Sequence, residues 1–457
     1  MPFTKQRLIF AIALALGISS TQYAYAQSDL RHGENLTWDD LQWDDAEGED
    51  NFITAQSTAP EENIFDNAPD IDSFKPSPPN PSFASHATTA NGRQAGRMLD
   101  ASIESMLKSG GISPEDRRDL LDLQNLLLEN PVAASEALEQ LAGSQNANLA
   151  AATQKGTEQI TAHLLSAMRA IPTDTAGDAN GRFWLQGLGA SGRLEGQGGS
   201  AGLKQGTQGL LVGADWAVDH AWRAGVMGAK TTSDFDAKRF DATLDSWHLG
   251  AYAVRQDGPL ALRLGAIYSS HDGNNKRNVD IFGEKDQLKG KYNAQSQTAF
   301  GEVGYQVGQG SFSAEPFAGL GYQRYHRDSF KEKGGDAALN VGAQTQENLS
   351  STFGIRLASL HKFDNQLSLT PHLSTSWKHL YGDVGSQVRQ SSRWISEMGL
   401  NGNFTTQGTS LDRDSLAMRA GLDLGLSEYQ TVGLTYNVET GTNSRNQGLM
   451  GQWTLSF

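Results

Sequence analysis

The strongest constraint on the fold is an alternation of apolar and polar residues that runs from Gly181 to Phe457. In the last segment Leu449, Trp453 and Leu455 fall on one side of a strand, and polar residues stand between them. A period of two indicates β-strands with one apolar and one polar face. Twelve such segments begin near residues 181, 207, 221, 244, 259, 293, 311, 348, 366, 412, 429 and 446.

The connections between these segments favour a membrane barrel over a soluble β-sandwich. One set consists of tight turns such as Asp257-Gly258, whereas most links of the other set, for example 272–292 and 382–411, are long. Short periplasmic turns and long extracellular loops are typical of outer-membrane barrels, whose strands need about 9–11 residues to cross. An unpaired backbone group in hydrocarbon costs several kcal/mol, so the sheet must close. The sequence predicts a 12-stranded antiparallel outer-membrane β-barrel over residues 181–457.

In such a barrel the charged strand residues are expected to face the lumen, because a charge on the lipid face costs about 2–4 kcal/mol at the midplane. Both signs are present, so the lumen needs no single strong field. The expected lumenal charges are Arg263, Glu302, Glu315, Arg356, Lys378, Arg419 and Asp423. Candidates for interfacial aromatic belts, or in some cases for lumenal packing, are Trp184, Tyr268, Trp377, Tyr436 and Trp453.

The N-terminus has the pattern of an export signal. Lys5 and Arg7 precede the apolar run Leu8 to Ile18, and Ala24-Tyr25-Ala26 follows. This order predicts a secretory signal peptide over residues 1–26. An interfacial or buried helix is the alternative.

Residues 27–92 are strongly acidic and are predicted to be a disordered passenger segment. They hold fourteen Asp and Glu against two Lys and Arg, and six of the thirteen prolines. Such a stretch buries too little apolar surface to offset its chain entropy. The paired Trp38-Asp39-Asp40 and Trp43-Asp44-Asp45 leave three interpretations open: a short recognition motif, a weak Ca²⁺ contact or a solvated spacer.

Residues 93–180 are expected to form a helical junction. One helix is expected after Ser113-Pro114, and a second opens at Asn130-Pro131 and closes near Gly143. A third, over about 148–171, is rich in alanine and glycine and is therefore slim. It suits a narrow lumen, and it equally suits an ordinary small bundle.

Composition excludes several functions. The net charge of −15 argues against nucleic acid as a partner. The lack of cysteine excludes disulfides, thiolate metal sites and a cysteine nucleophile. No apolar run reaches the length of a membrane-spanning helix.

The barrel region resembles the translocator barrel of type V autotransporters. The similarity is carried by Phe183-Trp184-Leu185-Gln186-Gly187, by 209–215, 315–322, 334–339 and 377–383, and by the terminal Phe457. The sequence Leu138 to Gly143 is similar to the helical junction that precedes such barrels. The passenger is unusually short for the family, at most Gln27 to about Asn148.

The resemblance implies export of the N-terminal passenger to the cell surface, with a helix left in the pore and no cofactor. It implies outer-membrane lipid, the barrel-assembly machinery and periplasmic chaperones as partners, together with a possible extracellular ligand of the passenger. The barrel is expected to be monomeric. The residues similar to the barrel-assembly signal are Leu449, Trp453, Leu455 and Phe457.

We expect no enzyme, although alternatives remain. A structural or pore-forming barrel with a vestigial passenger is one of them. A barrel-embedded hydrolase using Ser270-His271-Asp272 is another, and self-cleavage at Asn148 assisted by Glu302 or Glu315 is a third. The G-x-S-x-G match at 198–202 lies in a loop, where the motif has no nucleophile elbow to occupy.

Overall fold

The computed structural model describes residues 82–108, 118, 130–171, 181–281, 284–309, 311–363 and 367–457. The expected signal peptide, the paired Trp-Asp-Asp motif and the helix expected after Ser113 lie outside these residues.

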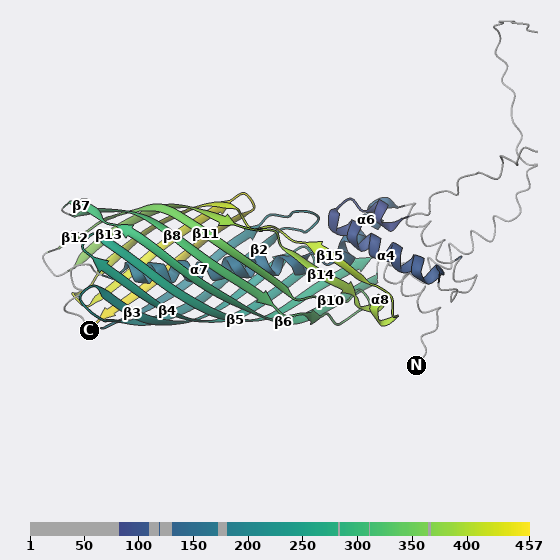
Figure 1. Cartoon of the computed structure of the whole chain (residues 1–457), viewed down its shortest axis with the longest axis horizontal. Coiled ribbons are helices and arrows are strands. Elements are labelled where there is room, and N and C mark those ends of the chain that lie inside the picture. Colours follow the sequence, from purple (N-terminus) through teal and green to yellow (C-terminus); the bar gives the residue numbers. More distant parts are fainter. Residues whose placement is uncertain are drawn as a thin grey trace, which may run out of the picture.

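Twelve long antiparallel strands close into a barrel, as predicted (Figure 1). Closure is made by β18 on β1, paired continuously from Arg182 with Ser456 to Leu194 with Ser444. The short strands β7 (Val307–Gln309) and β12 (His361–Lys362) add to the turns. The barrel strands are β1 (Gly181–Leu194), β2 (Leu203–Ala217), β3 (Trp222–Ala237), β4 (Phe240–Asp257), β5 (Leu260–Ile281), β6 (Glu284–Tyr305), β8 (Phe312–Arg327), β11 (Gln344–Ser359), β13 (Ser368–Tyr381), β16 (Asp414–Gly425), β17 (Gln430–Gly441) and β18 (Ser444–Ser456).

The outer face of the barrel carries an apolar band between two aromatic belts. Leu449 is 50% exposed and its neighbour Met450 only 2%, so the two faces alternate as predicted. The belt at the short-turn end includes exposed Trp216, Tyr305, Phe312, Phe363 and Tyr429. The second belt includes Trp247, Tyr268, Tyr322, Trp377 and Tyr436. An apolar band flanked by aromatic girdles, about 25 Å tall, is what an outer membrane requires.

Two connections expected to be long loops are strands instead. β3 continues to Ala237 and β5 to Ile281, so the β3–β4 and β5–β6 links are tight hairpins beyond the second belt. The period of two persists there, but its sides are exchanged, with apolar side chains such as Phe235 and Val279 buried inside. The exchange follows from the change of solvent, because outside the bilayer the outer face meets water. This part of the wall is therefore built like a soluble protein.

A small globular layer closes the long-loop end of the barrel (Figure 1). Two loops form a four-stranded sheet with the short helix α8 (Arg393–Glu397). Its strands are β9 (Phe330–Lys331), β10 (Leu339–Val341), β14 (Gln387–Ser392) and β15 (Asn403–Gln407). Three helices, which we call the cap, share one apolar core with this sheet and the inner wall. They are α3 (Phe83–His86), α4 (Ala90–Lys108) and α6 (Pro131–Ala142).

The cap begins earlier than the sequence suggests. α3 and the first turn of α4 lie inside residues 27–92, for which we expect disorder. The acidic, proline-rich composition ends at Pro81, and the apolar stripe that follows packs against α6. α6 has the expected ends: the Asn130 side chain accepts a hydrogen bond from Ala133 N, and Gly143 is left-handed with φ of 54°.

The long helix α7 (Gln145–Arg169) lies inside the barrel and starts slightly before the expected 148 (Figure 1). Its 25 residues span about 37 Å at 1.5 Å per residue. Ala150, Ala151 and Ala152 are fully buried, so the slim helix fits the lumen rather than a bundle. Among the described helices none has the length and hydropathy to span a membrane.

The proposed position of the bilayer predicts which outward residues tolerate charge. Val226→Arg places a cation between the two belts and should lower the free energy of unfolding by about 2–4 kcal/mol. Thr232→Arg, on the same outer face of β3 beyond Trp247, should change it by less than about 1 kcal/mol. Urea unfolding in liposomes measures both, and equal losses would contradict this bilayer position.

Candidate functional site: the helix-filled pore

α7 rests with one apolar face on one half of the barrel wall. Ile160, Leu164, Ala167 and Met168 recur at helical spacing and are buried. Their partners come from β1 to β5 and include Trp184, Leu188, Leu211, Met227 and Tyr252. Trp184 Nε1 donates to Tyr252 Oη at 2.7 Å, so the indole N–H buried under this face is paired. The contact fixes the rotation of the helix in the lumen.

The opposite face of α7 meets a buried cluster of arginine and glutamate. Glu302 accepts hydrogen bonds from Arg169 Nη2 at 2.5 Å, from Arg356 Nη2 at 2.6 Å and from Arg263 Nη1 at 3.1 Å. Glu315 accepts from Arg263 at 2.7 Å. Of these five residues only Arg169 belongs to the helix. Glu302 therefore holds together three arginines, one on the helix and two on the wall, that would otherwise repel one another.

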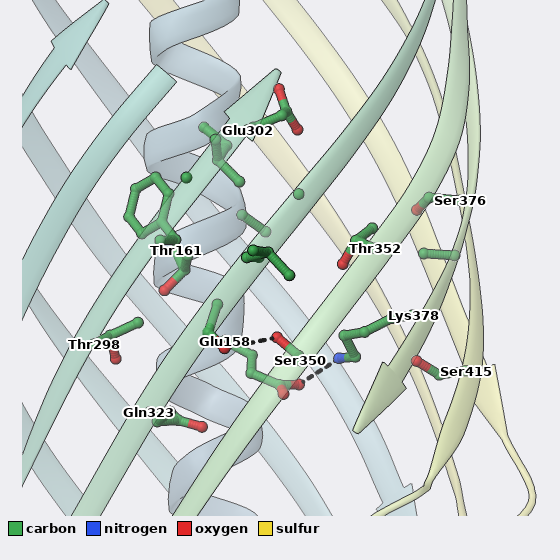
Figure 2. A pocket seen from close by; sticks show the side chains of 18 of the residues that line it. Glu158, Thr161, Thr298, Glu302, Gln323, Ser350, Thr352, Ser376, Lys378 and Ser415 are labelled. Atoms are coloured by element: carbon green, nitrogen blue, oxygen red, sulfur yellow. Dashed lines mark hydrogen bonds and ion pairs between the residues drawn. The ribbon is translucent and has the colours of Figure 1, made fainter. Parts of the chain in front are cut away.

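A second charged cluster holds the middle of α7. Lys378 Nζ donates to Glu158 at 2.8 Å and to Glu439 at 3.0 Å, and Lys155 Nζ donates to Glu439 at 3.2 Å. The cluster holds two cations and two anions: Lys155 and Glu158 belong to the helix, and Lys378 and Glu439 belong to the wall. Figure 2 shows the Glu158–Lys378 contact.

The helix leaves part of the lumen unfilled. A cavity of about 170 Å³ lies between α7 and the wall strands from β6 to β17 (Figure 2). Arg169 and Glu158 line it from the helix, and Arg419 and Thr298 line it from the wall. Because the apolar face of α7 is committed to β1–β5, the polar half of the wall faces this space.

The long-loop end of the pore is closed around Asn146 at the start of α7. Its Nδ2 donates to Glu332 at 3.1 Å and to Gln390 at 3.0 Å, and its Oδ1 accepts from Asn275 at 2.8 Å. Its carbonyl accepts from Arg327 at 2.9 Å. One residue of the helix is thus bonded to β5, β8 and both loops of the outer sheet.

Asn148, one half-turn later, forms similar bonds to the β1–β2 loop and to the loop between β13 and β16. Its Nδ2 donates to Ser200 Oγ at 2.9 Å, and its Oδ1 accepts from Thr409 N at 2.7 Å. We call Asn146, Asn148 and these partners the mouth clamp. Each unsatisfied buried polar group would cost about 1–3 kcal/mol, so withdrawal of the helix is opposed at every contact.

The seven charges expected in the lumen all belong to the inner face. Arg263, Glu302, Glu315 and Arg356 come together in one cluster, and Lys378 joins the other. Asp423 lies apart and accepts from Gln452 at 2.9 Å.

Sequence reasoning missed two groups. Glu439 follows from the alternation with outward Tyr436 on β17, so its signal was available. The second group, Arg169, Lys155 and Glu158, lies on α7, and its role appears only once the helix is placed in the lumen.

Two catalytic alternatives are wrong on geometry. His271 points inward and contacts Ser246 and Ser296, whereas Ser270 and Asp272 are exposed on the outer face, so the three cannot form a triad. Glu302 contacts Arg169, which lies 21 residues beyond Asn148 on the same helix, about 31 Å away. Glu302, and Glu315 which shares Arg263 with it, therefore cannot assist cleavage at Asn148.

Comparison with known proteins agrees with this geometry. A family model described as the autotransporter beta-domain matches residues 183–437. The chain belongs to the autotransporter beta-domain family. Its barrel is an outer-membrane translocator barrel, and the resemblance inferred from the sequence is confirmed.

The relatives place this translocator in longer chains. Two curated proteins named extracellular serine protease, from Serratia marcescens, are 29% and 28% identical over 328 residues. The match covers 70% of this chain but 31% of each relative. Among solved structures, the translocator domain of the autotransporter NalP from Neisseria meningitidis is similar, with a TM-score of 0.52 and 16% identity. That match covers 68% of this chain and 99% of the NalP domain.

Because Glu302 is the shared partner of three arginines, its substitution should lower the free energy of unfolding much more than the same substitution of an exposed glutamate. Glu302→Gln leaves buried guanidinium groups without their shared anion and should cost about 3–5 kcal/mol. Glu347→Gln breaks an exposed pair with Arg324 and should cost less than about 1 kcal/mol. Denaturant unfolding of the refolded protein compares them. Similar costs would show that Glu302 does not hold the helix.

Proposed function

We propose that the barrel exports the N-terminal residues, directed to the periplasm by residues 1–26, and keeps them at the cell surface. The observation that carries the proposal is the course of α7. Its last residue, Arg169, contacts Glu302 close to the short-turn end, where β1 also starts, and its first residues lie in the opposite mouth. In this proposal the described residues before α7, which form the cap, lie on the far side of the membrane from the turns.

The closed sheet supports passage through the lumen. Every barrel strand is paired on both sides, from β1 around to β18 and back. A side exit would break a row of backbone hydrogen bonds in hydrocarbon, at several kcal/mol for each group left unpaired. The lumen is the route that leaves the wall intact.

Contacts of the cap support retention rather than release. In α6, Gln140 Nε2 donates to the carbonyl oxygen of Asp280 at 2.9 Å, and Gln140 Oε1 accepts from the backbone N–H of Asp280 at 2.7 Å. In α4, Asn91 pairs with the backbone of Gln407 at 2.7 and 2.8 Å. Each side-chain amide thus uses both its donor and its acceptor on the backbone of one strand residue, as a neighbouring strand would. The exported segment is thus bonded to β5 and β15 as well as to the mouth clamp.

We propose that export proceeds without a catalytic step in this chain. The relatives are named as proteases, but the match covers only 31% of each relative. The buried pairs Ser246–His271 and Ser269–His248 contact hydroxyl groups or each other's rings, which favours a packing role. The ligand of the acidic segment, the assembly machinery and periplasmic chaperones remain proposed partners.

The C-terminal residues are suited to recognition by the assembly machinery. Leu449 and Phe457 are exposed on the outer face, in line with Trp453 and Leu455. Phe457 exchanges two backbone hydrogen bonds of 2.9 Å with Gly181. The signal is therefore part of the seam that closes the barrel.

Cysteine labelling tests the proposed orientation, because the chain has no cysteine of its own. Val132→Cys, on exposed α6, should react with a membrane-impermeant maleimide on intact cells. Gly258→Cys, in the β4–β5 turn, should react only after the outer membrane is permeabilised. If Val132→Cys is protected in an assembled barrel, the chain exports nothing and the alternative of a resident barrel with a vestigial passenger holds.

The terminal aromatic residue is expected to determine how efficiently the barrel assembles. Phe457→Ala removes the terminal aromatic ring from the seam and should reduce the amount of heat-modifiable barrel in the outer membrane severalfold. Ser456→Ala, its inward neighbour, should assemble normally. Gel mobility with and without boiling measures both variants. Normal assembly of Phe457→Ala would contradict the proposal that Phe457 is part of the assembly signal.

A further inference from the structure

The wall beyond the second aromatic belt carries a groove lined by lysines. The groove, of about 890 Å³, lies over β4, β5, β6 and the β9 loop. Its charged lining consists of one aspartate, Asp241, and five lysines: Lys276, Lys289, Lys291, Lys331 and Lys333. The chain as a whole is acidic, so this local excess of positive charge is hidden in the composition.

Three of these lysines are set side by side across neighbouring strands. Lys276 is the direct cross-strand partner of Lys289, and Lys289 is bridged to Lys333 by backbone hydrogen bonds of 2.8 and 2.9 Å. Like charges directly opposite one another destabilise a sheet. Within the described residues none of the five ammonium groups has a carboxylate within 4.0 Å. Asp241 is the cross-strand partner of Lys276 on β4 but forms no ion pair with it, so the repulsion around Lys289 costs stability unless an anion bridges the lysines.

The mouth clamp holds this face in place from inside. Between Lys331 and Lys333, Glu332 points inward and binds Arg277 at 2.6 Å. Beside Lys276, Asn275 points inward and donates to Asn146. Alternation along the strands then puts the lysines outside. The cationic groove is preorganised, because the backbone that carries it is fixed by buried bonds.

We propose that this groove binds the phosphate and carboxylate groups of outer-leaflet glycolipid. Lys276 lies eight residues beyond the belt residue Tyr268 on the same outer face, about 26 Å further along the strand and roughly 20 Å further along the barrel axis, because the strands are tilted by about 40°. That height is above the hydrocarbon and within the layer of acidic saccharide headgroups. The groove lies on the same outward side of the wall as the apolar band, so the headgroup of a lipid that packs against the band extends toward the groove. Lysine is a point-charge ligand suited to phosphate.

This inference uses the proposed orientation, but its test does not. Purified full-length protein in neutral detergent is titrated with deep-rough lipopolysaccharide, with the same material dephosphorylated, and with inorganic phosphate. The combined variant Lys276→Gln, Lys289→Gln and Lys333→Gln should weaken binding of the phosphorylated glycolipid about 100-fold at low salt. The matched variant Lys204→Gln, Lys230→Gln and Lys238→Gln, on neighbouring exposed positions, should bind within about twofold of the parent.

The groove variant should also keep or raise its melting temperature, because repulsion between the lysines is removed. Equal weakening by both variants would indicate general charge attraction and overturn the proposal. So would unchanged binding by the groove variant, or a lower melting temperature that accounts for its weakness. Tight binding of inorganic phosphate alone, or of a synthetic peptide of residues 27–81 in place of glycolipid, would assign the groove to another anion and overturn the proposal as well. Failure of export in cells leaves these results unaffected.

Discussion

The hydrocarbon core of the bilayer offers no hydrogen-bond partners, so every backbone N–H and C=O group within it must be paired inside the protein. Because a sheet in the bilayer tolerates no free edge, twelve strands close on themselves, with β18 against β1. Closure creates one enclosed route between the two sides, and α7 occupies it. The same constraint that makes the wall continuous therefore defines where the N-terminal residues cross.

The wall changes character where it leaves the membrane, and the change explains the three ways in which it holds α7 and the cap. Within the bilayer the inner face is free to carry charge, and Glu302 and Glu439 bind α7 there by ion pairs. Beyond the belt the inner face turns apolar and builds a core with the cap. Between these regions lies the mouth clamp, where Asn146 and Asn148 use directional hydrogen bonds. Charge, directional bonding and apolar burial act in succession along one helix and its upstream segment.

Much of the barrel could be predicted from local pattern. The alternation identifies twelve strands. It also places residues such as Arg263 inside, because in a strand successive side chains point to opposite faces. The ends of α6 follow from Asn130-Pro131 and Gly143 for equally local reasons. The extent of β5 could not be predicted in this way, since its outer half keeps the period but exchanges its apolar and polar sides. The partners of Asn146 come from β5, β8 and two loops, and no local signal brings such distant residues together.

α7 is seated in the mouth of the barrel through Asn148. Disulfide formation between Asn148→Cys and Ser200→Cys tests this seating, because Asn148 Nδ2 donates to Ser200 Oγ at 2.9 Å. No other cysteine is present to compete. In assembled protein from intact cells we predict that this pair oxidises readily, whereas Asn148→Cys with Gly258→Cys does not. An assembled barrel in which the first pair of introduced thiols stays reduced under oxidant would show that the helix is not held there, and the account would fail.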